Sequence, residues 1–140
     1  MNGSKILTII LLGSGILGTC VGAGLLLVPE MFHASSGIEI GGNVSLLSET
    51  RAPGGALLAI GALITAGAFV RHLRFTATVL ATVVYLSYGL GRVLSMLVDG
   101  LPSSILVQAA ILELVIGGVC LAALLRYRPG PTGHHSTAKG

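Results

Sequence analysis

Two ionisable side chains, Arg92 and Glu113, lie inside long apolar stretches of the sequence. A charge in apolar surroundings is costly, so such residues pair with each other, bind a ligand or carry protons. At the rise of an α-helix, Arg92 lies roughly 10 Å and Glu113 roughly 15 Å from the turn between the two stretches, a difference that a long arginine side chain can reduce. We therefore expect these two residues to form an ion pair or to share one network.

This pair allows two interpretations, and the sequence leaves both open. A buried ion pair can be structural, because it fixes the register of two helices without taking part in chemistry. Alternatively, intramembrane charges mark a ligand or proton site.

Further polar side chains share a helix face with Arg92. Tyr85, Tyr88, Arg92 and Asp99 recur at steps of three and four residues, which places them on one side of a helix. Glu49 and Arg51 are expected near the same membrane face as Asp99. The candidate residues for ligand binding or a structural ion pair are Arg92, Glu113, Asp99, Arg51, Glu49, Tyr85 and Tyr88.

The sequence contains no recognisable catalytic motif. It has no Walker or GxGxxG pattern, and its glycines follow helix faces instead. Cys20 and Cys120 lie in apolar runs, which predicts two buried, inert thiols, and no Cys or His spacing is typical of a metal site. We therefore predict that the protein is not an enzyme and holds no cofactor and no metal.

Composition identifies the broad class of the protein. Of its 140 residues, 53% are hydrophobic and only 9% are charged, whereas a soluble domain carries about 25% charged residues. This deficit predicts an integral membrane protein. The net charge of +3 comes from few residues and indicates membrane topology rather than a nucleic-acid partner.

We predict an all-α fold, a bundle of four transmembrane helices over residues 6–28, 54–70, 75–98 and 103–125. Each stretch is long enough, or nearly so, to cross an apolar core of about 30 Å. These helices form one domain over residues 1–128, and the composition of 129–140 predicts a disordered tail. Lys5 followed by an apolar run also resembles a signal peptide, but the run is long for one, so we treat it as the first helix.

A long loop is expected between the first two helices, over residues 29–53. Two short alternating runs flank Gly41-Gly42, a pattern typical of a β-hairpin. We therefore expect a small hairpin or lid over one end of the bundle.

Small residues recur at helical spacing in the first two helices. Gly15, Gly18 and Gly22 share one face of the first helix, and Gly54 and Gly61 share one face of the second. Glycines at this spacing allow helix backbones to approach closely in lipid. We expect a close helix contact there, within the chain or between copies.

Basic residues gather on one predicted side of the membrane. The positive-inside rule then places both termini in the cytoplasm. The residues on that side are Lys5, Arg71, Arg74, Arg126, Arg128 and Lys139, and those on the other side include Glu30, Glu39, Glu49 and Asp99.

Four segments of the chain form a recognisable set: 48–55 (SETRAPGG), 89–95 (GLGRVLS), 99–102 (DGLP) and 113–114 (EL). They resemble a known family of small bacterial four-helix membrane proteins, grouped as domain-of-unknown-function family 4345. The resemblance implies a multi-pass protein of the bacterial inner (plasma) membrane, and it implies no chemistry.

Small size, glycine-rich faces and the lack of a catalytic motif predict an accessory or scaffold subunit. Its partners would be the lipid bilayer and a larger membrane protein or a second copy of the chain, with no nucleic acid. The alternative is a binding or transport module for a lipid or small amphiphile, using a charged pocket in the outer half of the bundle.

Overall fold

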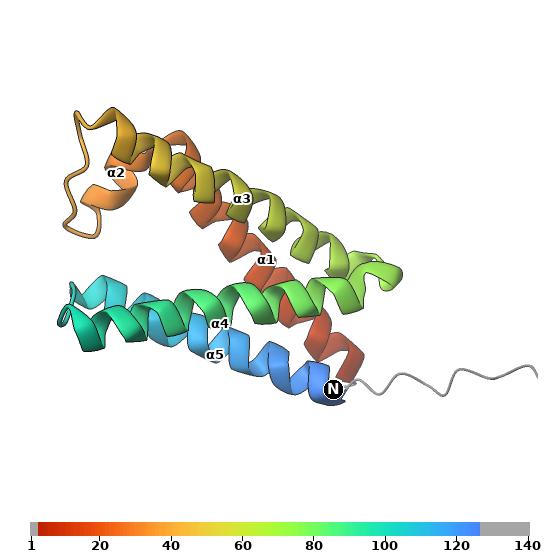
Figure 1. The fold of residues 1–140 in the computed structure, drawn as a ribbon. Coiled ribbons are helices and arrows are strands. Elements are labelled where there is room, and N and C mark those ends of the chain that lie inside the picture. The colour runs from red at the N-terminus through yellow and green to blue at the C-terminus, as the bar shows by residue number, and fades with distance from the viewer. Residues whose placement is uncertain (1–2, 127–140) are drawn as a thin grey trace, which may run out of the picture.

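The computed structural model describes residues 3–126, and this part of the chain is helical with no strand (Figure 1). Four helices in it are long and apolar enough to cross a membrane, which identifies a multi-pass membrane protein and confirms the predicted all-α class. The elements are α1 (Gly3–Leu27), α2 (Pro29–Ala34), α3 (Val44–Phe69), the 3₁₀ turn η1 (Arg71–Leu73), α4 (Arg74–Val98) and α5 (Ser104–Arg126).

The four long helices form two pairs. α1 packs along α3, and α4 packs along α5, while contacts between the pairs are fewer. The pairs converge toward η1 and diverge toward the opposite end, which holds α2 and the turn between α4 and α5 (Figure 1). We call these the η1 end and the α2 end.

The α1–α3 pair is built on glycine, as the sequence predicted. A Cβ on Gly22 would lie 2.7 Å from the Leu58 Cα and 2.8 Å from the Gly54 oxygen, and one on Gly61 would lie 2.8 Å from the Gly18 carbonyl carbon. Gly18 itself has ordinary contacts of 3.5 Å. The close approach of α1 to α3 therefore depends most on the glycines that face backbone atoms.

A second glycine contact joins α4 and α5. Gly89 receives the Leu114 side chain and Gly117 receives the Leu86 side chain, each with a leucine carbon 2.7 Å from where a Cβ would lie. The lack of a side chain on each glycine thus makes room for a leucine from the other helix, and the pair closes tightly.

The buried core lies where the two pairs cross. Its members come from α1, α3, α4 and α5, and they are Leu11, Ile64, Ala68, Ala77, Ala81, Tyr85 and Cys120. Cys120 is buried, as expected, but Cys20 is exposed. The prediction for Cys20 was wrong because two residues along an α-helix correspond to roughly 200° of rotation, which turns this thiol away from the face that holds Gly18 and Gly22.

The predicted long loop and β-hairpin over residues 29–53 are absent. Residues 29–34 form α2, and Val44 already belongs to α3. The Asn43 side-chain oxygen accepts a 3.0 Å hydrogen bond from the Leu46 backbone N–H, so Asn43 caps a helix where the alternating pattern suggested a strand. Gly37 and Gly42 each have a φ of 79°, and they make turns between the two helices.

Pro53 lies inside α3 and does not mark its beginning. The predicted helix over 54–70 began after this proline, whereas the helix in the structure begins at Val44. In the structure the proline only removes the backbone donor for the carbonyl four residues earlier, and the helix runs through it. α3 is therefore longer than predicted.

The other helices lie near their predicted ranges. α1, α4 and α5 end at Leu27, Val98 and Arg126, compared with predicted ends at 28, 98 and 125. The segment 129–140, predicted to be disordered, lies outside the described residues.

Replacing Gly22 with alanine tests the backbone contact between α1 and α3. We expect Gly22→Ala to lower the free energy of unfolding by about 1–3 kcal/mol, because the added methyl overlaps α3 backbone atoms. Gly13→Ala on the same helix is the control, since no atom lies within 4 Å of a Cβ there. Unfolding by denaturant titration in micelles compares the two variants, and equal stability would contradict the proposed role of Gly22.

Candidate functional site

A cleft of about 340 Å³ lies between the two helix pairs, toward the α2 end. All four long helices contribute to its walls, and α2 and the turn after it contribute the remainder. Pockets for small molecules usually occupy about 300–1,000 Å³, so the cleft has the volume of a small binding site.

The walls of the cleft are mostly apolar. Aliphatic side chains from both helix pairs face one another across it, and a few polar groups interrupt this surface. The apolar members include Leu17, Val21, Leu25, Leu57, Ile105, Leu106 and Leu112, and the polar members are His33, Ser35, Ser36, Tyr85, Tyr88, Arg92 and Glu113. An apolar pocket with a small number of placed polar groups is the usual composition of a ligand site.

Arg92 on α4 and Glu113 on α5 form an ion pair in the wall of the cleft. The Arg92 Nε–H donates to both carboxylate oxygens of Glu113, at 2.9 Å and 3.2 Å. The two side chains are 31% and 15% exposed. The pairing expected from the sequence is therefore present, and it uses only one of the three guanidinium nitrogens of Arg92.

The turn and the glycine packing between α4 and α5 bring this pair together. Gly100 has a φ of 98°, a conformation that glycine adopts without strain, and it reverses the chain. Gly89 then admits Leu114 between the helices, so the residue next to Leu114, Glu113, comes within reach of Arg92. Antiparallel helices held this closely place the two charges at the same depth.

Tyr85 closes the inner end of the cleft. It is 6% exposed, and its hydroxyl donates a 2.5 Å hydrogen bond to the Ser14 carbonyl of α1. This bond joins the two helix pairs near their crossing. Tyr85 therefore belongs to the structure that holds the cleft in place.

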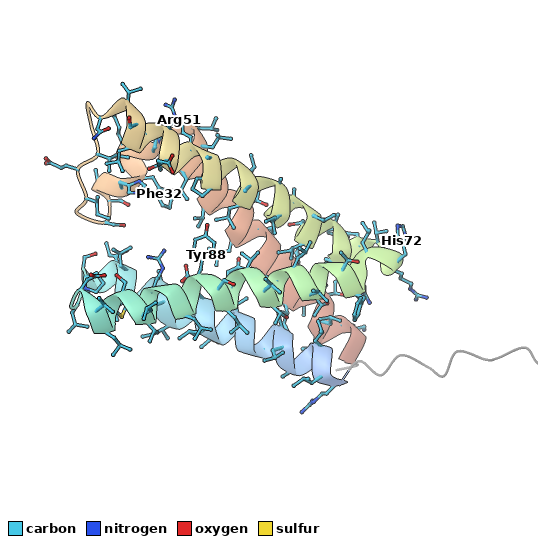
Figure 2. All side chains as sticks on the ribbon, viewed as in Figure 1. Phe32, Arg51, His72 and Tyr88 are labelled. Carbon is cyan, nitrogen blue, oxygen red and sulfur yellow. The ribbon has the colours of Figure 1, made fainter. Side chains whose placement is uncertain are left out.

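Tyr88 lies one turn further along α4, beside Arg92. It is 37% exposed, and among the described residues its hydroxyl makes no hydrogen bond. Figure 2 shows it on the side of α4 that faces the gap between the helix pairs. Tyr88 and Arg92 also border a shallow depression on α4, together with Ser87, Gly91 and Ser95.

α2 covers the cleft from the α1–α3 side, and sequence reasoning missed this contribution. The Phe32 ring packs against Gly24 of α1, which has no side chain to obstruct it. His33 Nδ1 lies 3.0 Å from the Pro29 carbonyl, so the Nδ1–H donates a hydrogen bond to this oxygen. Pro29 was the available signal, since proline favours the first turn of a helix.

Three other candidate residues lie outside the cleft. Asp99 is exposed at the end of α4, where it accepts a 2.9 Å hydrogen bond from the Ser95 hydroxyl. Glu49 and Arg51 are exposed on α3, and Figure 2 shows Arg51 on the part of α3 at the α2 end. They do not cover the bundle, because the segment that holds them is helix and not a hairpin.

The cleft offers hydrogen-bond donors beside a neutralised charge pair. Within residues 3–126, no group of three His, Cys, Asp or Glu side chains that could hold a metal ion comes together. The arrangement suits the binding of an apolar molecule with a polar head.

Comparison with known proteins identifies a family match over most of the chain. Residues 6–124 match the family described as Domain of unknown function (DUF4345). No curated protein and no solved structure matches the chain. The matched residues include α3, α4, most of α1 and α5, and every side chain of the cleft named above.

A double-mutant cycle tests the coupling between Arg92 and Glu113. Arg92→Leu or Glu113→Leu leaves the other charge without its partner, which costs up to about 3–5 kcal/mol when a pair is buried. We expect the double variant to recover much of this loss, because it leaves neither charge in the bundle. Unfolding in micelles measures all three variants, and additive single effects would mean that the two residues do not interact.

Proposed function

We propose that this chain, which belongs to the domain-of-unknown-function family DUF4345, binds a single-chain amphiphile in the cleft between its helix pairs. The observation that carries the proposal is a cavity of about 340 Å³ with aliphatic walls and one ion pair. The chain of the ligand would lie among the aliphatic side chains, and its head would lie beside Arg92 and Tyr88.

The size and composition of the cleft support one chain rather than two. Its volume is near the lower limit for small-molecule pockets, about 300 Å³, and a phospholipid with two acyl chains is far larger. The aliphatic walls, which include Leu17, Val21 and Leu106, offer a hydrocarbon chain van der Waals contacts, which are the packing forces that operate inside lipid.

Two observations support the entry of the proposed ligand into the cleft from the membrane. The helices around the cleft are long and apolar enough to lie within a bilayer. Arg92 and Tyr88 line both the cleft and the depression on the flank of α4. A membrane amphiphile could therefore reach the head-group position without leaving the bilayer.

An accessory or scaffold role is the second candidate, but no single contact favours it. The glycine faces that suggested a partner are used within the chain, because Gly15 and Gly22 face α3. The exposed aliphatic residues of α5 are equally suited to lipid and to a protein. A stoichiometric protein that co-purifies in mild detergent would support this role.

A cleft-filling substitution tests the proposed binding. Ala109 lines the cleft on α5, so Ala109→Phe would occupy the space of a bound chain. We expect this variant to lose at least tenfold in affinity for a single-chain ester such as methyl dodecanoate. Ala122→Phe is the matched control, because Ala122 is exposed on the same helix.

Binding is measured with a radiolabelled ester and protein in phosphatidylcholine nanodiscs, after subtracting the signal of empty nanodiscs. Both variants must retain the helical content and thermal stability of the parent protein. Equal binding by Ala109→Phe and Ala122→Phe would refute the proposal that the cleft holds the ligand.

We further propose that the protein lies in a bacterial plasma membrane with both termini in the cytoplasm. The η1 end carries the beginning of α1, the end of α5 and the connection that contains His72 (Figures 1 and 2). This arrangement gathers Lys5, Arg71, Arg74 and Arg126 at one end, and basic residues near helix ends favour the cytoplasmic side. Glu30, Glu39 and Asp99 lie at or near the α2 end.

Thiol labelling of intact cells tests this orientation. In a background with Cys20→Ala and Cys120→Ala, we expect Leu101→Cys to react with a membrane-impermeant maleimide. We expect His72→Cys to react only after the membrane is permeabilised, because it would face the cytoplasm. The reverse pattern would contradict the orientation, and both positions are exposed in the structure.

A further inference from the structure

We infer that the head group bound in the cleft is uncharged and accepts hydrogen bonds, and that Glu113 sets this preference by neutralising Arg92. The inference rests on the proposed binding of a single-chain amphiphile. It assigns a chemical class to the ligand, such as an ester or amide carbonyl on one hydrocarbon chain.

The first step is the geometry of the ion pair. Both carboxylate oxygens of Glu113 accept from Arg92 Nε, and the two terminal nitrogens of Arg92 make no hydrogen bond to any residue from 3 to 126. Among the described residues, the side-chain nitrogens and oxygens that are both buried and without a hydrogen bond include neither of these two nitrogens. These nitrogens are therefore accessible donors, and donors require acceptors from a ligand or from water.

The second step is the neighbouring hydroxyl of Tyr88. It lines the same cleft, and it makes no hydrogen bond within the described part of the chain. A carbonyl oxygen has two lone pairs. Such an oxygen placed beside Arg92 could accept from the guanidinium and from a tyrosine hydroxyl at the same time.

The third step is the charge of the cleft. Among the described residues that line it, Arg92 and Glu113 form the charged pair, and the lining includes no other Asp, Glu, Lys or Arg. The pair has no net charge, so an anionic head would leave one uncompensated negative charge among aliphatic side chains. A cationic head would leave one positive charge, whereas an uncharged acceptor leaves none, and uncompensated charge in such surroundings is costly.

These steps give Glu113 a specificity role besides its structural one. It holds the guanidinium through Nε and leaves the terminal nitrogens free for the ligand. Its negative charge cancels the attraction that Arg92 would otherwise exert on fatty carboxylates. Glu113 therefore acts through Arg92 as a positioning residue, and it excludes anionic amphiphiles.

The test uses four probes with the same hydrocarbon chain and different heads: methyl dodecanoate, dodecanoate, dodecyltrimethylammonium and dodecane. Binding to protein in phosphatidylcholine nanodiscs at pH 8 is corrected with empty nanodiscs. We expect the methyl ester to bind at least fivefold more tightly than each of the other three probes.

Glu113→Gln is the decisive variant, because glutamine keeps an oxygen acceptor for Arg92 Nε and removes the negative charge. We expect the preference to switch, with dodecanoate binding at least tenfold more tightly than it does to the parent protein. In the double variant Arg92→Leu/Glu113→Leu, the preference for the ester over dodecane should be smaller than in the parent protein, because of the two donors only the Tyr88 hydroxyl remains. Thermal unfolding confirms that each variant is folded.

Several outcomes would overturn the inference. A parent protein that prefers dodecanoate would do so, and so would a Glu113→Gln variant that keeps the parent's order of probes. The order of the four probe affinities, measured on the parent protein, is sufficient to test the inference even if Glu113→Gln does not fold. If the parent protein binds the ester and dodecane equally and Ala109→Phe weakens the binding of each, the inference is wrong and the proposed function stands. If Ala109→Phe weakens the binding of neither probe, the inference and the proposed function are both wrong.

Discussion

The close approach of helix backbones at glycine is the constraint on which the rest of this structure depends. Between helices in lipid, apolar side chains gain little by leaving an equally apolar solvent, so association depends on packing and hydrogen bonds. The glycine contacts of α1 with α3 and of α4 with α5 provide such packing within each pair. Fewer contacts join one pair to the other than join the helices within each pair. The cleft lies between the two pairs, where they are not in contact.

The contacts that do cross between the pairs lie away from the α2 end. Gly67 of α3 receives Ala77 of α4 near η1, and the Tyr85 hydroxyl bonds to α1 at the inner end of the cleft. Arg74 adds a hydrogen bond to Thr8 of α1 at the η1 end. The pairs are therefore held together at one end and separated at the other, where α2 covers part of the space between them.

The proposed ligand binding would give the Arg92 side chain a second purpose besides its ion pair. Arg92 Nε satisfies Glu113, which lets both charges lie in an apolar bundle. The terminal nitrogens remain available to the cleft. The structural and the ligand-binding interpretations of the pair are thus compatible, because they concern different atoms of the same guanidinium.

The sequence by itself determined the membrane class, the four long helices, the glycine face between the first two of them and the expectation of a charge pair. Each of these follows from local rules: apolar length, helical spacing and the cost of a lone charge. The helix through Pro53 could not be predicted in this way, because the Asn43 cap and the packing of Gly54 on α1 outweigh the local signal for a turn.

Only the tertiary structure decided which candidate residues share one site. It brings Tyr85, Tyr88, Arg92 and Glu113 to one cleft, and it leaves Glu49, Arg51 and Asp99 outside. It also adds α2, whose place depends on the fit of Phe32 against Gly24 of another helix. Spacing along a chain fixes which residues share a helix face. The divergence of the two helix pairs, which forms the cleft, depends instead on contacts between segments that are distant in the sequence.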